Sequence, residues 1–134
     1  MSEYDILVVE DDAYLMDLFG DALSDLGFAV QVAASPREVE QHLERTSELQ
    51  ALLMDVDLRA SLDGFDLVAR VRTEHPDVKV VFVSGTRVDW TKRSLGIYDR
   101  FLSKPARLID VAAALVELGV VPSLPPAIGP RATF

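Results

Sequence analysis

The stretch Ala51–Asp57, Ala-Leu-Leu-Met-Asp-Val-Asp, decides the fold, because it is a short apolar run that ends in two carboxylates. Four apolar residues in a row predict a strand buried on both faces, as in a parallel sheet covered by helices. A carboxylate at the carboxyl end of such a strand lies where open α/β sheets bind their ligands. Asp55 is therefore the first candidate for a functional residue.

Other apolar runs and helical repeats alternate along the chain around this stretch. The expected strands are Ile6–Val9, Phe28–Ala33, Ala51–Met54, Val78–Val83 and Phe101–Leu102. The expected helices are Leu15–Leu26, Pro36–Arg45, Phe65–Glu74, a short Trp90–Leu95 and Arg107–Leu118. Five strand–helix pairs in succession predict an α/β fold of the doubly wound, flavodoxin-like type, a five-stranded parallel sheet, (βα)5, with helices on both faces.

Several residues mark the ends of the expected helices. Asp12 is expected to be the N-cap of the first helix, and Gly27 suits the position after its last turn. Ser35, Pro36 and Glu38 together are typical of a helix start, with serine as N-cap, proline in the first turn and glutamate closing a capping box.

Composition excludes several classes of protein. The chain has 134 residues, of which 49% are hydrophobic, enough for one domain with a real core. No apolar run approaches the roughly 20 residues of a membrane span, and the start lacks a signal pattern. There is no cysteine, and the net charge of −9 argues against binding nucleic acid through overall electrostatics. We expect a soluble, cytoplasmic protein without membrane or nucleic-acid partners.

The strand ends carry a set of polar groups that should meet at one edge of the sheet. These residues are Glu10, Asp11, Asp55, Asp57, Ser84 and Lys104. Clustered carboxylates repel one another unless a cation joins them, and a hard divalent ion such as Mg²⁺, or Mn²⁺, prefers oxygen ligands. A carboxylate beside that ion can attack a phosphoryl donor to give an acyl phosphate, with the lysine neutralising the phosphoryl oxygens. The set therefore predicts Asp55 as a phosphoryl acceptor.

At this point the chain resembles the response regulator receiver domains of bacterial two-component signalling. The stretches that carry the resemblance are Ile-Leu-Val-Val-Glu-Asp-Asp (6–12), Leu-Leu-Met-Asp (52–55), Asp63-Gly64-Phe65, Val-Phe-Val-Ser-Gly (81–85) and Phe-Leu-Ser-Lys-Pro (101–105). Each is weak alone, but their order and spacing together are highly specific. The resemblance predicts a receiver domain over residues 4–118, followed by a proline-rich tail or linker over 119–134.

The resemblance also implies a role for each candidate residue. Asp55 would be the phosphorylation site, and Ser84 and Lys104 would act on the phosphoryl group. The metal ligands would come from an acidic pocket with Glu10, from the carboxylates of Asp11 and Asp55, and from the backbone carbonyl of Asp57. Phe101 would be an aromatic switch that rotates when Ser84 moves inward, although core packing is the alternative for that ring.

Three departures from the family pattern stand out. Arg59 occupies the position, four residues after the acceptor, where proline is common. The loop from Asp55 to Asp63 is one residue longer than usual, and the segment from Ser84 to Lys104 is about two residues shorter, so the fourth helix is expected to be reduced or irregular. We further expect the Asp57 side chain to slow attack of water on the acyl phosphate or to alter metal affinity.

The resulting hypothesis is a single-domain receiver, not an enzyme beyond its own phosphorylation and dephosphorylation. It would take a phosphoryl group from a histidine kinase or phosphotransfer protein in a phosphorelay and signal to a downstream protein by contact. A piece of a longer protein such as a hybrid kinase is an alternative, with the tail as linker. Two other functions stay open: a receiver fold that binds partners independently of phosphate, and a haloacid-dehalogenase-like phosphohydrolase built on Asp55-Val-Asp57. The second lacks the further acids it needs, since only Asp110 and Glu117 follow Lys104.

Overall fold

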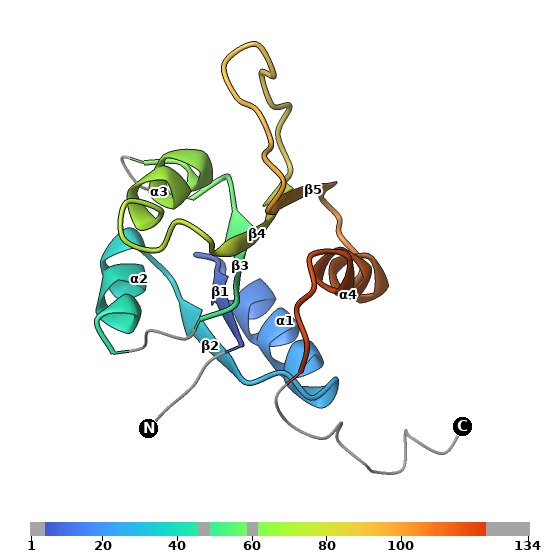
Figure 1. Cartoon of the computed structure of the whole chain (residues 1–134). Helices are drawn as coiled ribbons and strands as arrows, with labels where there is room; N and C mark the ends of the chain where they lie inside the picture. The colour runs from blue at the N-terminus through green and yellow to red at the C-terminus, as the bar shows by residue number, and fades with distance from the viewer. Residues whose placement is uncertain (1–4, 46–48, 59–61, 123–134) are drawn as a thin grey trace.

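A computed structural model describes residues 5–45, 49–58 and 62–122, in which five strands form one parallel sheet (Figure 1). The strands are β1 (Ile6–Val9), β2 (Val30–Ala33), β3 (Ala51–Asp55), β4 (Lys79–Ser84) and β5 (Asp99–Ser103). Their order in the sheet is β2-β1-β3-β4-β5, and every neighbouring pair is parallel. This is the flavodoxin-like order, so the predicted sheet is confirmed.

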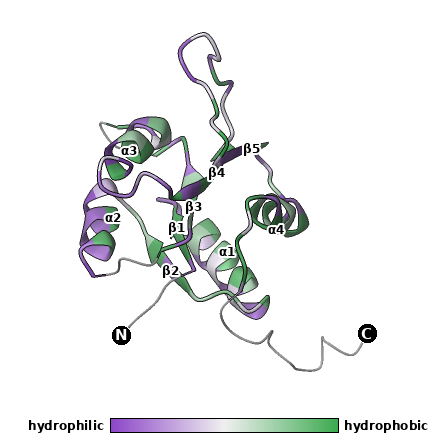
Figure 2. Cartoon of the chain, viewed as in Figure 1, coloured by the Kyte–Doolittle hydropathy of each residue, from purple (hydrophilic) through white to green (hydrophobic). Residues whose placement is uncertain are grey.

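Helices cover both faces of the sheet. Helices α1 (Ala13–Asp25) and α4 (Leu108–Glu117) lie on one face, and α2 (Pro36–Leu43) and α3 (Gly64–Val71) lie on the other (Figure 1). Alternate residues of the central strands point into separate cores, for example Leu7 and Leu52 toward α2 and α3, and Ile6 and Leu53 toward α1 and α4. Hydrophilic residues predominate in α2, whereas β2, α1 and α4 are largely hydrophobic (Figure 2).

The predicted helix signals act as expected. The Asp12 carboxylate accepts hydrogen bonds from the Tyr14 and Leu15 amides, and the Ser35 hydroxyl accepts one from the Glu38 amide. Gly27 follows α1 with a positive φ of 98°, which glycine adopts without the steric cost that a side chain adds.

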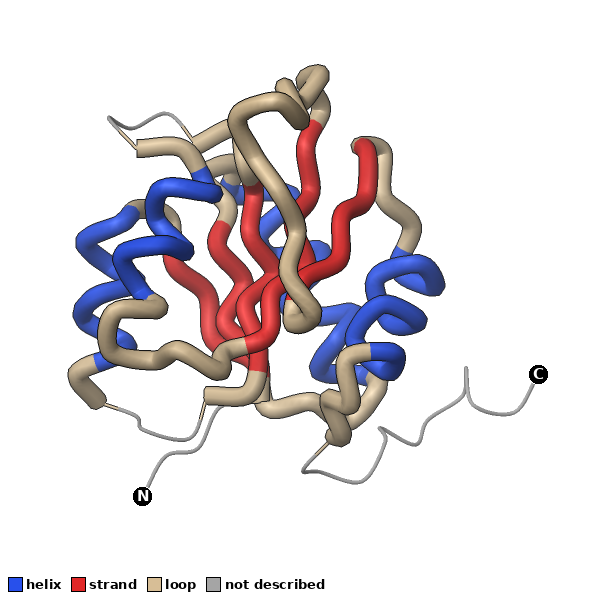
Figure 3. Tube along the Cα trace, turned by 45° about the horizontal axis from the view of Figure 1, so that its top comes forward, coloured by secondary structure: helices blue, strands red, loops and turns tan. Residues whose placement is uncertain are grey.

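The prediction of a short helix over Trp90–Leu95 is wrong, whereas the expectation of a reduced or irregular fourth helix is confirmed. Residues 85–98 run from β4 to β5 as loop and turns, so the described part of the chain has four helices rather than the five of a (βα)5 unit (Figure 3). One turn does form, because the Asp89 carbonyl accepts hydrogen bonds from the Lys92 and Arg93 amides. It does not continue, since a segment of six residues is too short to offset the cost of helix nucleation without strong tertiary support.

Tertiary contacts hold this loop in its non-helical path. The Trp90 ring meets Phe65 and Phe101 edge-on, at centroid distances of 6.2 and 5.1 Å. The Arg93 guanidinium lies 5.2 Å from the centre of the Phe65 ring. The same guanidinium pairs with Asp63 at 2.8 Å and with Asp66 at 3.0 Å. The loop is thus fastened to the start of α3.

Helix α3 begins in tight contact with the end of β3. A Cβ atom at Gly64 would lie 2.6 Å from the Asp55 carbonyl oxygen and 2.9 Å from the Met54 side chain, so no larger residue fits there without a backbone shift. The Asp63 carboxylate caps the helix by accepting a hydrogen bond from the Asp66 amide. Asp63-Gly64 thereby fixes where the chain returns to the sheet after Asp55.

Two of the sequence features fall outside the described residues: Arg59 and the part of the proline-rich tail from residue 123 onward. Among the helices of the described ranges, none is long and apolar enough to cross a membrane.

Candidate functional site

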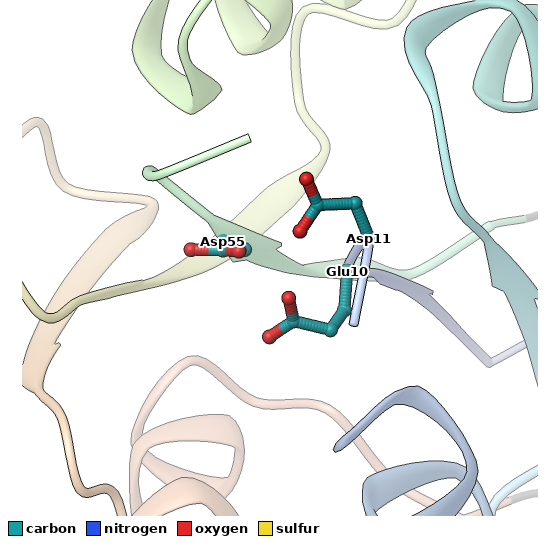
Figure 4. A group of neighbouring side chains, drawn as sticks. All are labelled: Glu10, Asp11 and Asp55. Carbon is teal, nitrogen blue, oxygen red and sulfur yellow. The ribbon is translucent and has the colours of Figure 1, made fainter. Parts of the chain in front are cut away.

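Three carboxylates gather at the carboxyl edge of the sheet. Glu10 and Asp11 follow β1 and Asp55 ends β3, and each offers a carboxylate oxygen within 4.8 Å of the others (Figure 4). Glu10 and Asp55 are 6% and 4% exposed, and Asp11 is half-buried. Negative groups this close, with this little water, suit a hard cation with oxygen ligands, so the residues fit Mg²⁺.

Lys104 supplies the positive charge that the protein itself places at this site. It follows β5, and its Nζ lies 3.0 Å from Asp55 Oδ1 and 3.6 Å from Glu10 Oε1. Burial alone would lower the pKa of Lys104, but the hydrogen bond to Asp55 and the charges of Asp55, Glu10 and Asp57 outweigh it and raise that pKa. Lys104 therefore stays positively charged beside Asp55.

Asp57 and Ser84 form a second group next to the carboxylates. The Asp57 carboxylate accepts hydrogen bonds from the Gly85 amide at 2.7 Å, the Thr86 hydroxyl at 2.8 Å and the Ser84 hydroxyl at 3.1 Å. Burial would raise the pKa of Asp57, but these three donors and Lys104 lower it. The Asp57 amide in turn donates to Asp55 Oδ1 at 2.9 Å, so the two groups are directly linked.

A comparison with known families decides the identity of this arrangement. The family model of the response regulator receiver domain matches residues 6–116. The chain belongs to this family. Receiver domains of this family act in bacterial two-component systems, and their role in signalling is generally non-enzymatic.

Similar proteins agree with this assignment. The nitrogen assimilation regulatory protein NtrX of Azorhizobium caulinodans is 34% identical over 125 residues, which cover 85% of this chain and 26% of NtrX. The sensor kinase CckA of Brucella abortus is 33% identical over 116 residues, 84% of this chain and 12% of the kinase. The receiver domain is thus similar to a minor part of each of these longer proteins.

Solved structures show the same fold. The receiver domain of NtrX from Brucella abortus superposes with a TM-score of 0.71 at 27% identity, covering 87% of this chain and all of that one. A response regulator receiver protein from Sinorhizobium medicae gives a TM-score of 0.76 at 23% identity over 87% of this chain and 94% of its own. At that identity the second likeness concerns the fold alone.

The structure brings together most of the residues that the sequence singled out, and it adds one that the sequence analysis did not name. Glu10, Asp11, Asp55 and Lys104 come together as expected. Ser84 lies beside them through Asp57, whose carboxylate turns to the end of β4. Thr86 was not singled out, although a hydroxyl two residues after a strand-end serine was a visible signal. The metal role of the Asp57 carbonyl stays a prediction.

Phe101 lies apart from the carboxylates, on the face that α2 and α3 cover. Its ring is half-buried and packs against Trp90 from the loop 85–98. Trp90 touches Phe65, whose ring stacks on Phe82 of β4 with centroids 4.4 Å apart. The ring thus packs against the core and contacts the loop that follows Ser84, and the switch role of Phe101 stays a prediction.

A cavity of about 470 Å³ opens beside Asp55. Its walls are mostly apolar and come from α1, from the central strands and from the turn after Lys104. The apolar lining includes Leu15, Leu18, Phe19, Pro105 and Ala106, and the polar side is formed by Glu10, Asp55 and Lys104.

The pKa of Glu10 is shifted far from its ordinary value. Burial raises its pKa from 4.5 to about 7, helped by a hydrogen bond shared with Asp55 and by the charge of that residue, while the Asp12 amide and Lys104 oppose the shift. A protonated Glu10 relieves the repulsion between the carboxylates. A divalent cation would do the same and release the proton.

We predict a pH dependence that follows from this shift. Because the folded pKa of Glu10 exceeds the unfolded value, its contribution to stability is fully present below about pH 4.5 and is lost as the pH rises through about 7. When a chelator removes divalent ions, the wild type should therefore lose stability between about pH 5.5 and 8 relative to the Glu10→Gln variant, because the glutamine side chain stays neutral. Denaturant unfolding at both pH values measures this, and equal losses in the two proteins would contradict it.

Proposed function

We propose that this receiver domain is phosphorylated on Asp55, in the presence of Mg²⁺ or Mn²⁺, by a histidine kinase or a histidine phosphotransfer protein. The observation that carries the proposal is the convergence of Lys104 with Glu10, Asp11 and Asp55 at one strand edge. A phosphohistidine donor made from ATP would place the exchange in the cytoplasm.

The chemistry follows from the positions of these groups. A carboxylate oxygen of Asp55 attacks the phosphorus of the phosphohistidine, an O–P bond forms as the P–N bond breaks, and the histidine nitrogen keeps the electron pair. Lys104, which already contacts Asp55 Oδ1, balances the negative charge on the phosphoryl oxygens. A divalent ion held by Glu10, Asp11 and Asp55, with the Asp57 carbonyl as a further ligand, would supply additional charge neutralisation when bound.

Exposed apolar side chains on α1 and α4 suit the docking of a phosphodonor protein. Tyr14 and Leu18 of α1 are 73% and 49% exposed, and Ile109 of α4 is 68% exposed. Leu18 also lines the cavity that reaches Asp55. Exposed apolar side chains mark contact sites, so we propose that the donor protein docks on these residues of α1 and α4. The similarity to a sensor kinase and to NtrX supports a kinase upstream and a protein target downstream.

The phosphohydrolase alternative finds no support in the positions of the later acids. Asp110 and Glu117 both lie on α4. Asp110 is paired with Arg107 at 3.1 Å, and Glu117 is paired with Arg100 at 3.1 Å. Neither is among the three acids that meet at the strand edge.

We propose that the signalling output is contact with a protein, through the surface formed by β5 and by the loop that follows Ser84.

We predict that incubation with acetyl phosphate and Mg²⁺ adds one phosphoryl group, seen by intact mass. The mass gain should be absent in Asp55→Asn, because the amide is a poor nucleophile, and unchanged in the control Asp21→Asn, whose carboxylate is exposed on α1. An unmodified wild type would favour the phosphate-independent binding module instead.

A further inference from the structure

The Ser84 hydroxyl already has a charged acceptor in the unphosphorylated protein. Ser84 is 1% exposed, so its hydroxyl must find a partner inside the protein. The acceptors in reach are Asp57 Oδ1 at 3.1 Å, the Thr86 carbonyl at 3.0 Å and the Thr86 hydroxyl oxygen at 3.1 Å. A bond to the ionised Asp57 is the stronger kind, because the acceptor is charged.

Asp57 holds more than this one hydroxyl. It also accepts from the Gly85 amide and the Thr86 hydroxyl, so its carboxylate binds three successive residues at the end of β4. These residues begin the non-helical loop that continues to Trp90 and Arg93. Asp57 therefore fixes the start of this loop, while Arg93 fixes its middle on α3.

A serine hydroxyl has one proton to donate. A phosphoryl group on Asp55 that accepts a hydrogen bond from this hydroxyl must therefore displace its present acceptor. We propose that Asp57 is a positioning residue that competes with the phosphoryl group for the Ser84 hydroxyl and so stabilises the resting position of the loop. This inference rests on the proposed phosphorylation of Asp55 and adds to it the group that phosphorylation displaces.

Competition has a measurable consequence. An interaction that stabilises the unphosphorylated, resting state lowers the affinity for a ligand that binds only the activated state. The affinity falls by the same factor by which the interaction favours the resting state. In Asp57→Asn the charged acceptor is lost, so beryllofluoride, which mimics a phosphoryl group on a carboxylate, should bind about 10-fold more tightly in Mg²⁺. The fluorine NMR signal of the bound form gives the dissociation constant, and Asp21→Asn is the control for a distant loss of charge.

A double-mutant cycle separates competition from simple charge repulsion. If Asp57 acts through Ser84, the effect of Asp57→Asn should fall to about 2-fold or less in a Ser84→Ala background. An equal gain in both backgrounds would show that repulsion alone is relieved, and would overturn the inference. If Asp57→Asn does not fold, Asp57→Ala serves as the second variant, with a gain at least as large expected.

The outcomes also separate this inference from the proposed function. A wild type that is phosphorylated and binds beryllofluoride, but whose affinity does not change in Asp57→Asn, rejects the competition and leaves phosphorylation standing. A wild type that binds neither acetyl-phosphate-derived phosphoryl nor beryllofluoride rejects both.

Discussion

Replacing Lys104 with methionine should slow phosphorylation of Asp55 by about 10²–10³-fold, the range seen when a preorganised charge-stabilising donor is removed from an active site. Lys104 Nζ lies 3.0 Å from Asp55 Oδ1, where negative charge gathers as the phosphoryl group arrives. It is also the basic group that contacts Glu10 at 3.6 Å. Methionine keeps much of the stem of the side chain and removes only the charge and the donor.

The measurement is the initial rate of mass gain with acetyl phosphate at saturating Mg²⁺. Affinity for Mg²⁺ itself should not fall, because a positive charge next to the carboxylates has been removed. Lys92→Met, at an exposed position of the loop 85–98, is the matched control and should keep the wild-type rate. A rate for Lys104→Met within about 3-fold of wild type would exclude the charge-stabilising role, since such a change is worth well under 1 kcal/mol.

Replacing Asp99 with alanine should lower the free energy of unfolding by about 2–3 kcal/mol. The change leaves the partly buried Arg72 guanidinium and the Gly96 amide without their carboxylate partner. Asp99 is 6% exposed at the start of β5 and accepts from Arg72 at 2.7 Å and from the Gly96 amide at 2.7 Å. Arg72 also donates to the Val78 carbonyl at 2.7 Å, so the pair joins the end of α3 to the entries of β4 and β5.

Chemical denaturation measures this loss, and two further variants test its cause. Arg107→Ala removes an exposed pair with Asp110, which solvent screens, and should leave the stability nearly unchanged. Replacing Arg72 with methionine in the Asp99→Ala protein should recover part of the loss, because the unpaired charge is then gone. If the double variant is less stable than Asp99→Ala, the unpaired charge is not the cause.

The sheet and the cluster of charged residues at its edge could be predicted because both depend on local sequence. A short apolar run such as Ile6–Val9 favours a buried strand. The polar residues that directly follow the run then lie at the edge of the sheet. Parallel strands bring those edges together, so Glu10, Asp11, Asp55 and Lys104 could be placed before any coordinates were known.

The loop between β4 and β5 could not be predicted in the same way. Its apolar residues Val88, Trp90 and Leu95 are compatible with a short helix, and Asp89 does start one turn. What prevents the helix is tertiary: Trp90 packs on rings from α3 and β5, and Arg93 pairs with two acids at the start of α3. The direction of the Asp57 carboxylate depends on the same loop and was equally hidden.

The position of Trp90 gives the protein an optical probe of its own. It is the single tryptophan of the chain, it is 48% exposed, and its indole contacts both Phe65 and Phe101. Any displacement of the loop changes the solvent around that ring, and with it the wavelength and intensity of the fluorescence. Movement of the loop can therefore be timed in a stopped-flow instrument on the unlabelled, unmodified chain.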